Sequence, residues 1–152
     1  MRIEVRSKSL AKDFIGDQPW AAISIATFSH EFAKLNATKR MGLLQMEFAD
    51  VDREDQVGTI NALCKSESHE PTCFFTEYQA EKIVDFVQQM KIKGIELFLV
   101  HCEAGVSRSP AIAAAIHKIF IDNNDNEYFK RYRPNMHVYS TIINHAHEKG
   151  LI

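Results

Sequence analysis

The sequence predicts an α/β fold, with a largely parallel central sheet and helices flanking it. Short apolar runs of strand length alternate along the chain with longer segments whose apolar residues recur at helical spacing. The run at residues 96–102, "ELFLVHC", is nearly continuous in apolar residues, which is typical of a strand buried on both faces of a parallel sheet. Strands interleaved with helices in this way build a parallel sheet covered by helices. We expect residues 1–152 to form one such domain, because no repeat or Pro/Gly-rich linker divides them.

Four segments have the pattern of strands. "RIEVRS" alternates apolar and polar residues, "AAISIAT" and "LLQMEFA" have a similar pattern, and "ELFLVHC" is the buried run described above. We therefore predict strands at residues 2–7, 21–27, 43–49 and 96–102.

Three segments have the pattern of helices. "TEYQ" at residues 76–79 has the form of a capping box, apolar residues follow it at helical spacing, and Gly94 provides a stop. A second helix is expected to begin at Ser109 and Pro110, because proline suits the first helical position. A third is predicted over residues 135–149.

Composition and charge limit the partners and the compartment. The net charge of −2 and the pI near 6.4 argue against a broad basic face for nucleic acid. No apolar run is long enough to cross a bilayer, and the N-terminus lacks the apolar region of a secretory signal. Three cysteines without a CxxC pair favour free thiols in a reducing cytoplasm. We expect a cytoplasmic protein without nucleic-acid or membrane partners, and a monomer is favoured, although the sequence does not determine the oligomeric state.

The segment "LVHCEAGVSRSP" at residues 99–110 has the composition of a phosphate-binding loop. Cys102 ends the buried strand, and Arg108 follows after five intervening residues, where the next helix is expected to begin. Amides of such a loop and of the helix's first turn converge on an anion, Gly105 allows the bend, and the guanidinium binds two phosphate oxygens at once. The same environment favours the thiolate of a cysteine, and Ser109 can donate a hydrogen bond to the sulfur. The expected substrate-binding residues are Glu103, Ala104, Gly105, Val106, Ser107 and Arg108. The alternative is that Cys102 is a small buried apolar residue at a strand end.

The nine residues "HCEAGVSRS" resemble the signature of the cysteine-dependent protein tyrosine phosphatases, and of their dual-specificity branch in particular. "RYRPN" at residues 131–135 is similar to the segment that opens a late helix in this branch, and "LLQMEFAD" at residues 43–50 is similar to the strand that precedes the family's general acid. The chain is shorter than the larger tyrosine phosphatase domains. Together the three matching segments extend the likeness over the chain from about residue 43 onward.

The resemblance implies a mechanism without a metal or another cofactor. Cys102 would be the nucleophile that forms a phosphocysteine, Arg108 would bind the phosphoryl group, and Ser109 would ease the departure of the sulfur. His101 corresponds to the family's histidine that holds the loop by hydrogen bonds, and no proton transfer is assigned to it. The implied substrate is a phosphorylated protein or a small phosphomonoester.

The general acid is expected just past the strand at residues 43–49. Asp50 fits this position best and Asp52 is the next candidate, with Asp55 and Glu70 as further alternatives. Asp50 precedes the cysteine by more residues than is usual in compact members of the family, and residues 57–75 have the character of an insertion. A solvated acidic turn without catalytic function is the simpler alternative for this cluster.

Two other kinds of function remain open. Related loops dephosphorylate RNA 5′ ends, nucleotides or inositol phosphates, although Glu103 and the absence of lysine in this loop disfavour highly anionic substrates. A phosphate-binding interaction module without catalysis is the second alternative, but such modules typically lose the cysteine or the arginine.

Three further groups of chemically active residues lie outside the loop. His145 and His147, with Glu148 beside them, are not expected to bind a metal, since residues i and i+2 of a helix point to different faces. Cys64 and Cys73 are expected to pack rather than to form a disulfide with an oxidised Cys102. Arg131 and Arg133 are either a solvated helix end or contacts to substrate.

Overall fold

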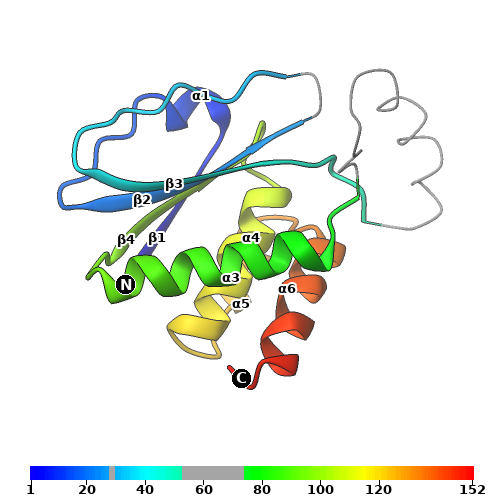
Figure 1. The fold of residues 1–152 in the computed structure, drawn as a ribbon. Helices are drawn as coiled ribbons and strands as arrows, with labels where there is room; N and C mark the ends of the chain where they lie inside the picture. The colour runs from blue at the N-terminus through cyan, green and yellow to red at the C-terminus, as the bar shows by residue number, and fades with distance from the viewer. Residues whose placement is uncertain (28–29, 53–73) are drawn as a thin grey trace.

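A computed structural model describes residues 1–27, 30–52 and 74–152 (Figure 1). Four parallel strands form one sheet in the order β1-β4-β2-β3. Their bounds are Arg2–Arg6 for β1, Trp20–Ala26 for β2, Arg40–Glu47 for β3 and Leu97–His101 for β4. The predicted fold class is confirmed, and all four predicted strands are present. The largest difference is at β3, which begins three residues earlier than predicted and ends two residues earlier.

Five helices accompany the strands in the described residues. Their bounds are Lys8–Ala11 for α1, Glu77–Ile92 for α3, Arg108–Phe120 for α4, Asn126–Arg131 for α5 and Met136–Glu148 for α6. The short helices α1 and α5 were not predicted, because four and six residues are too few to show a helical period.

The predicted capping box at the start of α3 is confirmed. The backbone N–H of Gln79 donates to Thr76 Oγ1 at 3.3 Å, and the backbone N–H of Thr76 donates to Gln79 Oε1 at 2.9 Å. At the other end of this helix Gly94 has a φ of +83°, the left-handed conformation that ends helices without a Cβ penalty. Local sequence therefore determines both ends of α3.

The start of α4 differs slightly from the prediction. The helix begins at Arg108 with Ser107 as its N-cap, so Pro110 occupies the third helical position rather than the first. Proline is tolerated there because the N–H groups of the first turn have no intrahelical acceptor. The shift brings Arg108 into the helix's first turn.

The sheet is covered on both faces (Figure 1). Helices α3, α4 and α6 pack on one face and enclose the larger core, to which Phe98 and Val100 of β4 contribute. On the opposite face Leu97 and Leu99 of β4 join a smaller apolar cluster with Trp20. Burial of alternate residues on both faces explains why this strand is apolar throughout.

The parallel order brings the carboxyl ends of the strands to one edge. His101 at the end of β4 lies opposite Arg6 of β1 and Ser24 of β2, and Ala26 of β2 lies opposite Glu47 of β3. The chain segments that leave β3 and β4 therefore emerge at the same edge. Ligands of parallel sheets bind there.

Candidate active site

Cys102 directly follows β4 and is 2 % exposed. The backbone N–H of Gly105 donates to Cys102 Sγ at 3.2 Å, and Ser109 Oγ lies 3.1 Å from the same sulfur. Both contacts come from the loop and helix that follow, so the chain folds back over the sulfur. A hydrogen bond donated to a sulfur stabilises its anionic form. This arrangement differs from that of a cysteine packed only against apolar side chains.

The loop after Cys102 requires glycine at position 105. Gly105 has a φ of +73°, and a Cβ there would lie 2.7 Å from the backbone nitrogen of Ser7 and 2.8 Å from the carbonyl carbon of Arg6. Close by, the backbone N–H of Lys8 donates to the carbonyl of Glu103 at 2.9 Å. The loop is thus held directly against the backbone that joins β1 to α1.

Substitution of Gly105 by alanine is expected to destabilise this loop. The left-handed conformation costs a residue with a Cβ about 1–3 kcal/mol, and the Cβ also overlaps backbone atoms that have little freedom to move. We expect thermal denaturation to show a fall in Tm of roughly 2–12 °C. Gly94→Ala is the matched control, because Gly94 has a similar φ of +83° but no atom within 4 Å of the position that a Cβ would occupy. Equal losses of Tm in the two variants would contradict a role for the backbone contact at Gly105.

The guanidinium of Arg108 is anchored from the neighbouring strands. Arg108 is 6 % exposed, and its Nη1 donates to Thr27 Oγ1 at 3.0 Å and to the carbonyl of Phe48 at 2.7 Å. Thr27 directly follows β2, and Phe48 directly follows β3. One side of the planar group is therefore fixed by hydrogen bonds while the residue still lines the cavity beside Cys102.

Asp50 is brought to the loop by two hydrogen bonds. Its Oδ1 accepts from Ser107 Oγ and from Asn135 Nδ2, each at 2.8 Å. Asn135 is 3 % exposed, donates also to the carbonyl of Val51 at 3.2 Å, and accepts the N–H of Val138 as the N-cap of α6. The start of α6 thus fixes the segment that carries the predicted acid.

The candidate active site is a cavity of about 400 Å³ formed around this loop. Its lining includes most of the loop positions predicted from the sequence, both leading acid candidates and one additional arginine: Asp50, Asp52, Cys102, Glu103, Ala104, Val106, Ser107, Arg108 and Arg133. Gly105 and Ser109 are buried behind the lining. The predicted alternatives Asp55 and Glu70 and the segment 57–73 lie outside the described residues, as do Cys64 and Cys73.

The carboxylate of Glu103 lies close to Lys8 and His30. Its Oε1 lies 3.9 Å from Lys8 Nζ and 3.4 Å from His30 Nδ1. All three side chains are partly or largely exposed, so water screens these contacts and each contributes little to stability. The acidic side chain is nevertheless held at the rim of the cavity.

His101 supports the loop from beneath. Its Nδ1 lies 3.2 Å from the carbonyl oxygen of Cys102, and its Nε2 lies 2.6 Å from Ser24 Oγ. Burial lowers the pKa of His101, which favours the neutral ring. A carbonyl can only accept, so Nδ1 carries the proton and the Ser24 hydroxyl donates to Nε2. The contact orients the Cys102 carbonyl, and both ring nitrogens of His101 are engaged by groups of the fold.

Four contributors to the site were not predicted from sequence: Ser24, Thr27, Asn135 and the carbonyl of Phe48. Each lies in or next to an element remote in sequence from the loop and acts through a hydrogen bond. Asn135 alone had a sequence signal, because Asn at the start of an apolar periodic segment is typical of an N-cap. The hydrogen bond that Asn135 also donates to Asp50 had no signal in the sequence.

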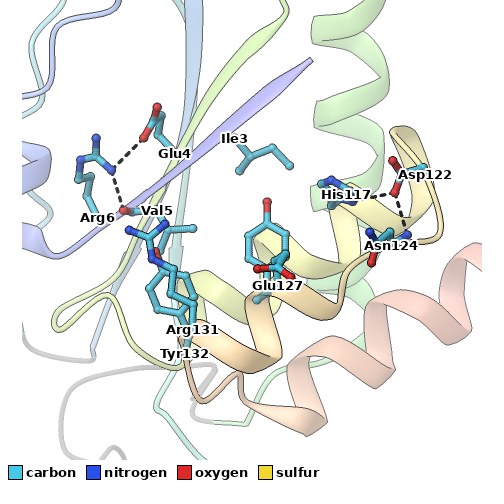
Figure 2. A pocket seen from close by; sticks show the side chains of 11 residues that line it. Ile3, Glu4, Val5, Arg6, His117, Asp122, Asn124, Glu127, Arg131 and Tyr132 are labelled. Carbon is cyan, nitrogen blue, oxygen red and sulfur yellow. Dashed lines mark hydrogen bonds and ion pairs between the residues drawn. The ribbon is translucent and has the colours of Figure 1, made fainter.

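A second cavity, of about 360 Å³, lies between β1, α4 and α5 (Figure 2). Arg6 pairs with Glu4 at 2.9 Å in its lining, and His117 Nδ1 lies 3.6 Å from Asp122 Oδ1. Arg131 lines this cavity, whereas Arg133 lines the one beside Cys102. Of the two arginines that the sequence offered as substrate contacts, the structure places only Arg133 at the candidate active site.

Among the described residues, no helix is long and apolar enough to span a membrane. Neither a protein-family model nor a curated protein sequence matches the chain.

Solved structures do match. The structure of human tyrosine phosphatase-like serine/threonine/tyrosine-interacting protein aligns with a TM-score of 0.52 and 19 % identity, covering 85 % of this chain and 77 % of that chain. Human DUSP28 aligns with a TM-score of 0.51 and 12 % identity over 97 % of this chain and 93 % of its own. PTPMT1 in complex with PI(5)P aligns with a TM-score of 0.51 and 14 % identity, over 95 % and 88 % of the two chains. The chain therefore has the fold of the dual-specificity phosphatases, the branch that its loop sequence resembles.

Proposed function

We propose that the protein is a cysteine-dependent phosphomonoester hydrolase that acts on phosphorylated tyrosine, serine or threonine side chains. The observation that carries this proposal is the convergence on one cavity of a thiol and an anchored guanidinium from one loop and a carboxylate from a distant segment. A nucleophile, a binder of phosphoryl oxygens and a proton donor are the three groups that phosphoryl transfer through a covalent intermediate needs.

In the first step the Cys102 thiolate attacks phosphorus and the bond between phosphorus and the ester oxygen breaks. The loop amides and Arg108 stabilise the charge on the phosphoryl oxygens as the S–P bond forms. Asp50 gives its proton to the departing oxygen. Because Asp50 Oδ1 already accepts two hydrogen bonds, its Oδ2 is the oxygen suited to carry that proton.

In the second step water hydrolyses the phosphocysteine. Asp50, now a carboxylate, takes a proton from the attacking water, the S–P bond breaks, and inorganic phosphate leaves. Ser109 Oγ, 3.1 Å from the sulfur, stabilises the thiolate as it departs. The cycle returns both Cys102 and Asp50 to their starting forms and uses no metal or cofactor.

The names of the structural relatives bear on the two alternatives, a phosphatase of inositol phosphates and a non-catalytic interaction module. PTPMT1 has been solved with PI(5)P, so this fold accommodates an inositol phosphate, and another relative carries the name of an interacting protein. Glu103 at the rim and the absence of lysine in the loop favour a phosphorylated protein over a polyanionic inositol phosphate.

Turnover of an aryl phosphate in the presence of EDTA separates a metal-independent enzyme from a binding module. A panel of phosphotyrosine, phosphoserine and phosphothreonine peptides, nucleotides and inositol phosphates then identifies the substrate class. We expect turnover in EDTA and the highest kcat/KM on a phosphopeptide. An absence of turnover with retained phosphopeptide binding would favour the interaction module.

Replacement of Arg108 by lysine is expected to be nearly as damaging as its replacement by alanine. Lysine keeps the positive charge but cannot bind two phosphoryl oxygens while donating to Thr27 and Phe48 from the same planar group. We expect kcat to fall by about 10²–10³-fold in both variants, the usual effect of losing a donor to the transition state. Steady-state kinetics on an aryl phosphate measure this, with Arg133→Lys as the control for a second arginine in the same cavity. Near-normal kcat in Arg108→Lys would show that charge alone suffices.

A further inference from the structure

Three potential metal ligands meet at a distance from the phosphate-binding loop, between the first turn of α3 and the last turn of α6. They are Glu77, His145 and Glu148, and one ligand atom from each lies within 4.8 Å of the other two. Together with Thr141 and Asn144 they line a separate cavity of about 170 Å³. Neither the predicted catalytic machinery nor the second cavity of Figure 2 includes these residues.

His145 is the buried member of this cluster. It is 4 % exposed, and its ring nitrogen faces the two carboxylates without a hydrogen bond or ion pair to any residue in the described ranges. Its nitrogen is not sealed in the interior but opens on the small cavity that the two glutamates also line. A ligand placed between the imidazole and the carboxylates would therefore meet a donor atom from each of the three residues.

The two neighbouring carboxylates of the cluster would also be stabilised by a cation. Glu148 is the last residue of α6, where the helix dipole disfavours a negative charge, and its carboxylate lies close to that of Glu77. Within the described part of the chain, neither glutamate forms an ion pair with lysine or arginine. A divalent cation would neutralise both carboxylates and interact favourably with the carboxyl end of α6.

We propose that Glu77, His145 and Glu148 bind a divalent transition-metal cation of the Zn²⁺ class and thereby join α3 to α6. An imidazole nitrogen and two carboxylate oxygens are a usual protein ligand set for Zn²⁺, with water completing the tetrahedron. The nitrogen ligand favours this class over Ca²⁺ and Mg²⁺, which prefer oxygen ligands alone.

To bind one ion, the three ligand atoms need to move only slightly closer to one another. Bonds of about 2.0–2.2 Å to a tetrahedral ion place ligand atoms about 3.3 Å apart, closer than the present separation of up to 4.8 Å. Glu77 and Glu148 are exposed and have rotatable side chains that permit this movement. His145 and Glu148 are three residues apart and share one helix face, whereas the exposed His147 lies on another. From sequence no metal is expected at His145, His147 and Glu148; the proposed site departs from that expectation by taking Glu77 of α3 in place of His147.

The test uses Co²⁺ and Zn²⁺ as probes on the intact chain. Calorimetry and thermal denaturation are carried out in the Cys102→Ser background, so that the active-site thiolate does not bind the ion. We expect one ion per chain and a rise in Tm on addition of either cation. The affinity should fall by more than about tenfold in His145→Gln and in Glu148→Gln, because loss of a ligand exceeds the cost of losing an outer-shell partner.

His147→Gln is the matched control and should bind both ions as the parent does. Glu148→Gln and Glu77→Gln change exposed residues and keep the test decisive if His145→Gln does not fold. Unchanged affinity in the ligand variants, equal stabilisation by Ca²⁺, or no binding at millimolar Co²⁺ would each overturn the proposal. None of these readouts depends on phosphatase turnover, so the result is independent of the proposed function.

Discussion

Replacement of Cys102 by serine is expected to abolish turnover while leaving phosphopeptide binding largely intact. A serine hydroxyl is not ionised at neutral pH and is a far weaker nucleophile than a thiolate, whereas the loop amides and Arg108 that bind phosphate remain in place. We expect kcat to fall by about 10⁴–10⁶-fold, the scale seen when a nucleophile is removed.

Steady-state kinetics on an aryl phosphate and calorimetry with a phosphopeptide measure the two properties separately. Cys102→Ser with Arg108→Ala in the same chain is the control, since it should lose binding as well as turnover. If a preparation of Cys102→Ser that contains no wild-type protein were nearly as active as the wild type, the phosphocysteine mechanism would be refuted. Loss of binding together with turnover would mean that the sulfur itself organises the loop.

Replacement of Asp50 by asparagine is expected to slow hydrolysis of a phosphate with a poor leaving group by about 10²–10⁴-fold. Asparagine has nearly the same shape and can still accept from Ser107 and Asn135, so the variant removes the proton and keeps the local geometry. A substrate with a good leaving group needs less protonation, and its phosphoryl transfer to the cysteine should suffer much less. Comparison of kcat/KM on an alkyl and a nitrophenyl phosphate measures this difference.

The pH profile provides a second readout for the same residue. The proposed acid must be protonated when the leaving oxygen departs, so the wild-type rate should fall as pH rises and the carboxyl group loses its proton. In Asp50→Asn that descending limb should flatten.

Asp52→Asn is the matched control, because Asp52 lines the same cavity. Asp55→Asn and Glu70→Gln extend the comparison to the other acids predicted from sequence. If Asp52→Asn shows the dependence on leaving group and Asp50→Asn does not, the acid lies two residues further along the chain.

Sequence patterns alone were sufficient for the fold class, the four strands and the ends of α3. These features depend on local signals, namely alternation, apolar runs and a capping box, and the structure confirms them. The loop at residues 102–108 could be identified in the same way, because the residues that contact the sulfur lie within seven positions of it. The side-chain roles inferred there stay predictions until the variants are measured.

Contributions from distant segments became visible only in the folded chain. Asp50 meets the loop through Ser107, 57 residues later, and through Asn135, 85 residues later. The grouping of Glu77 with His145 likewise depends on how α3 packs against α6. No local pattern encodes such pairs, because each contact results from burial of whole helix faces and from the parallel order of the strands. Local sequence thus specifies the elements and the nucleophile loop, and packing selects which side chains surround them, since hydrogen bonds across the fold depend on the distances that apolar burial sets.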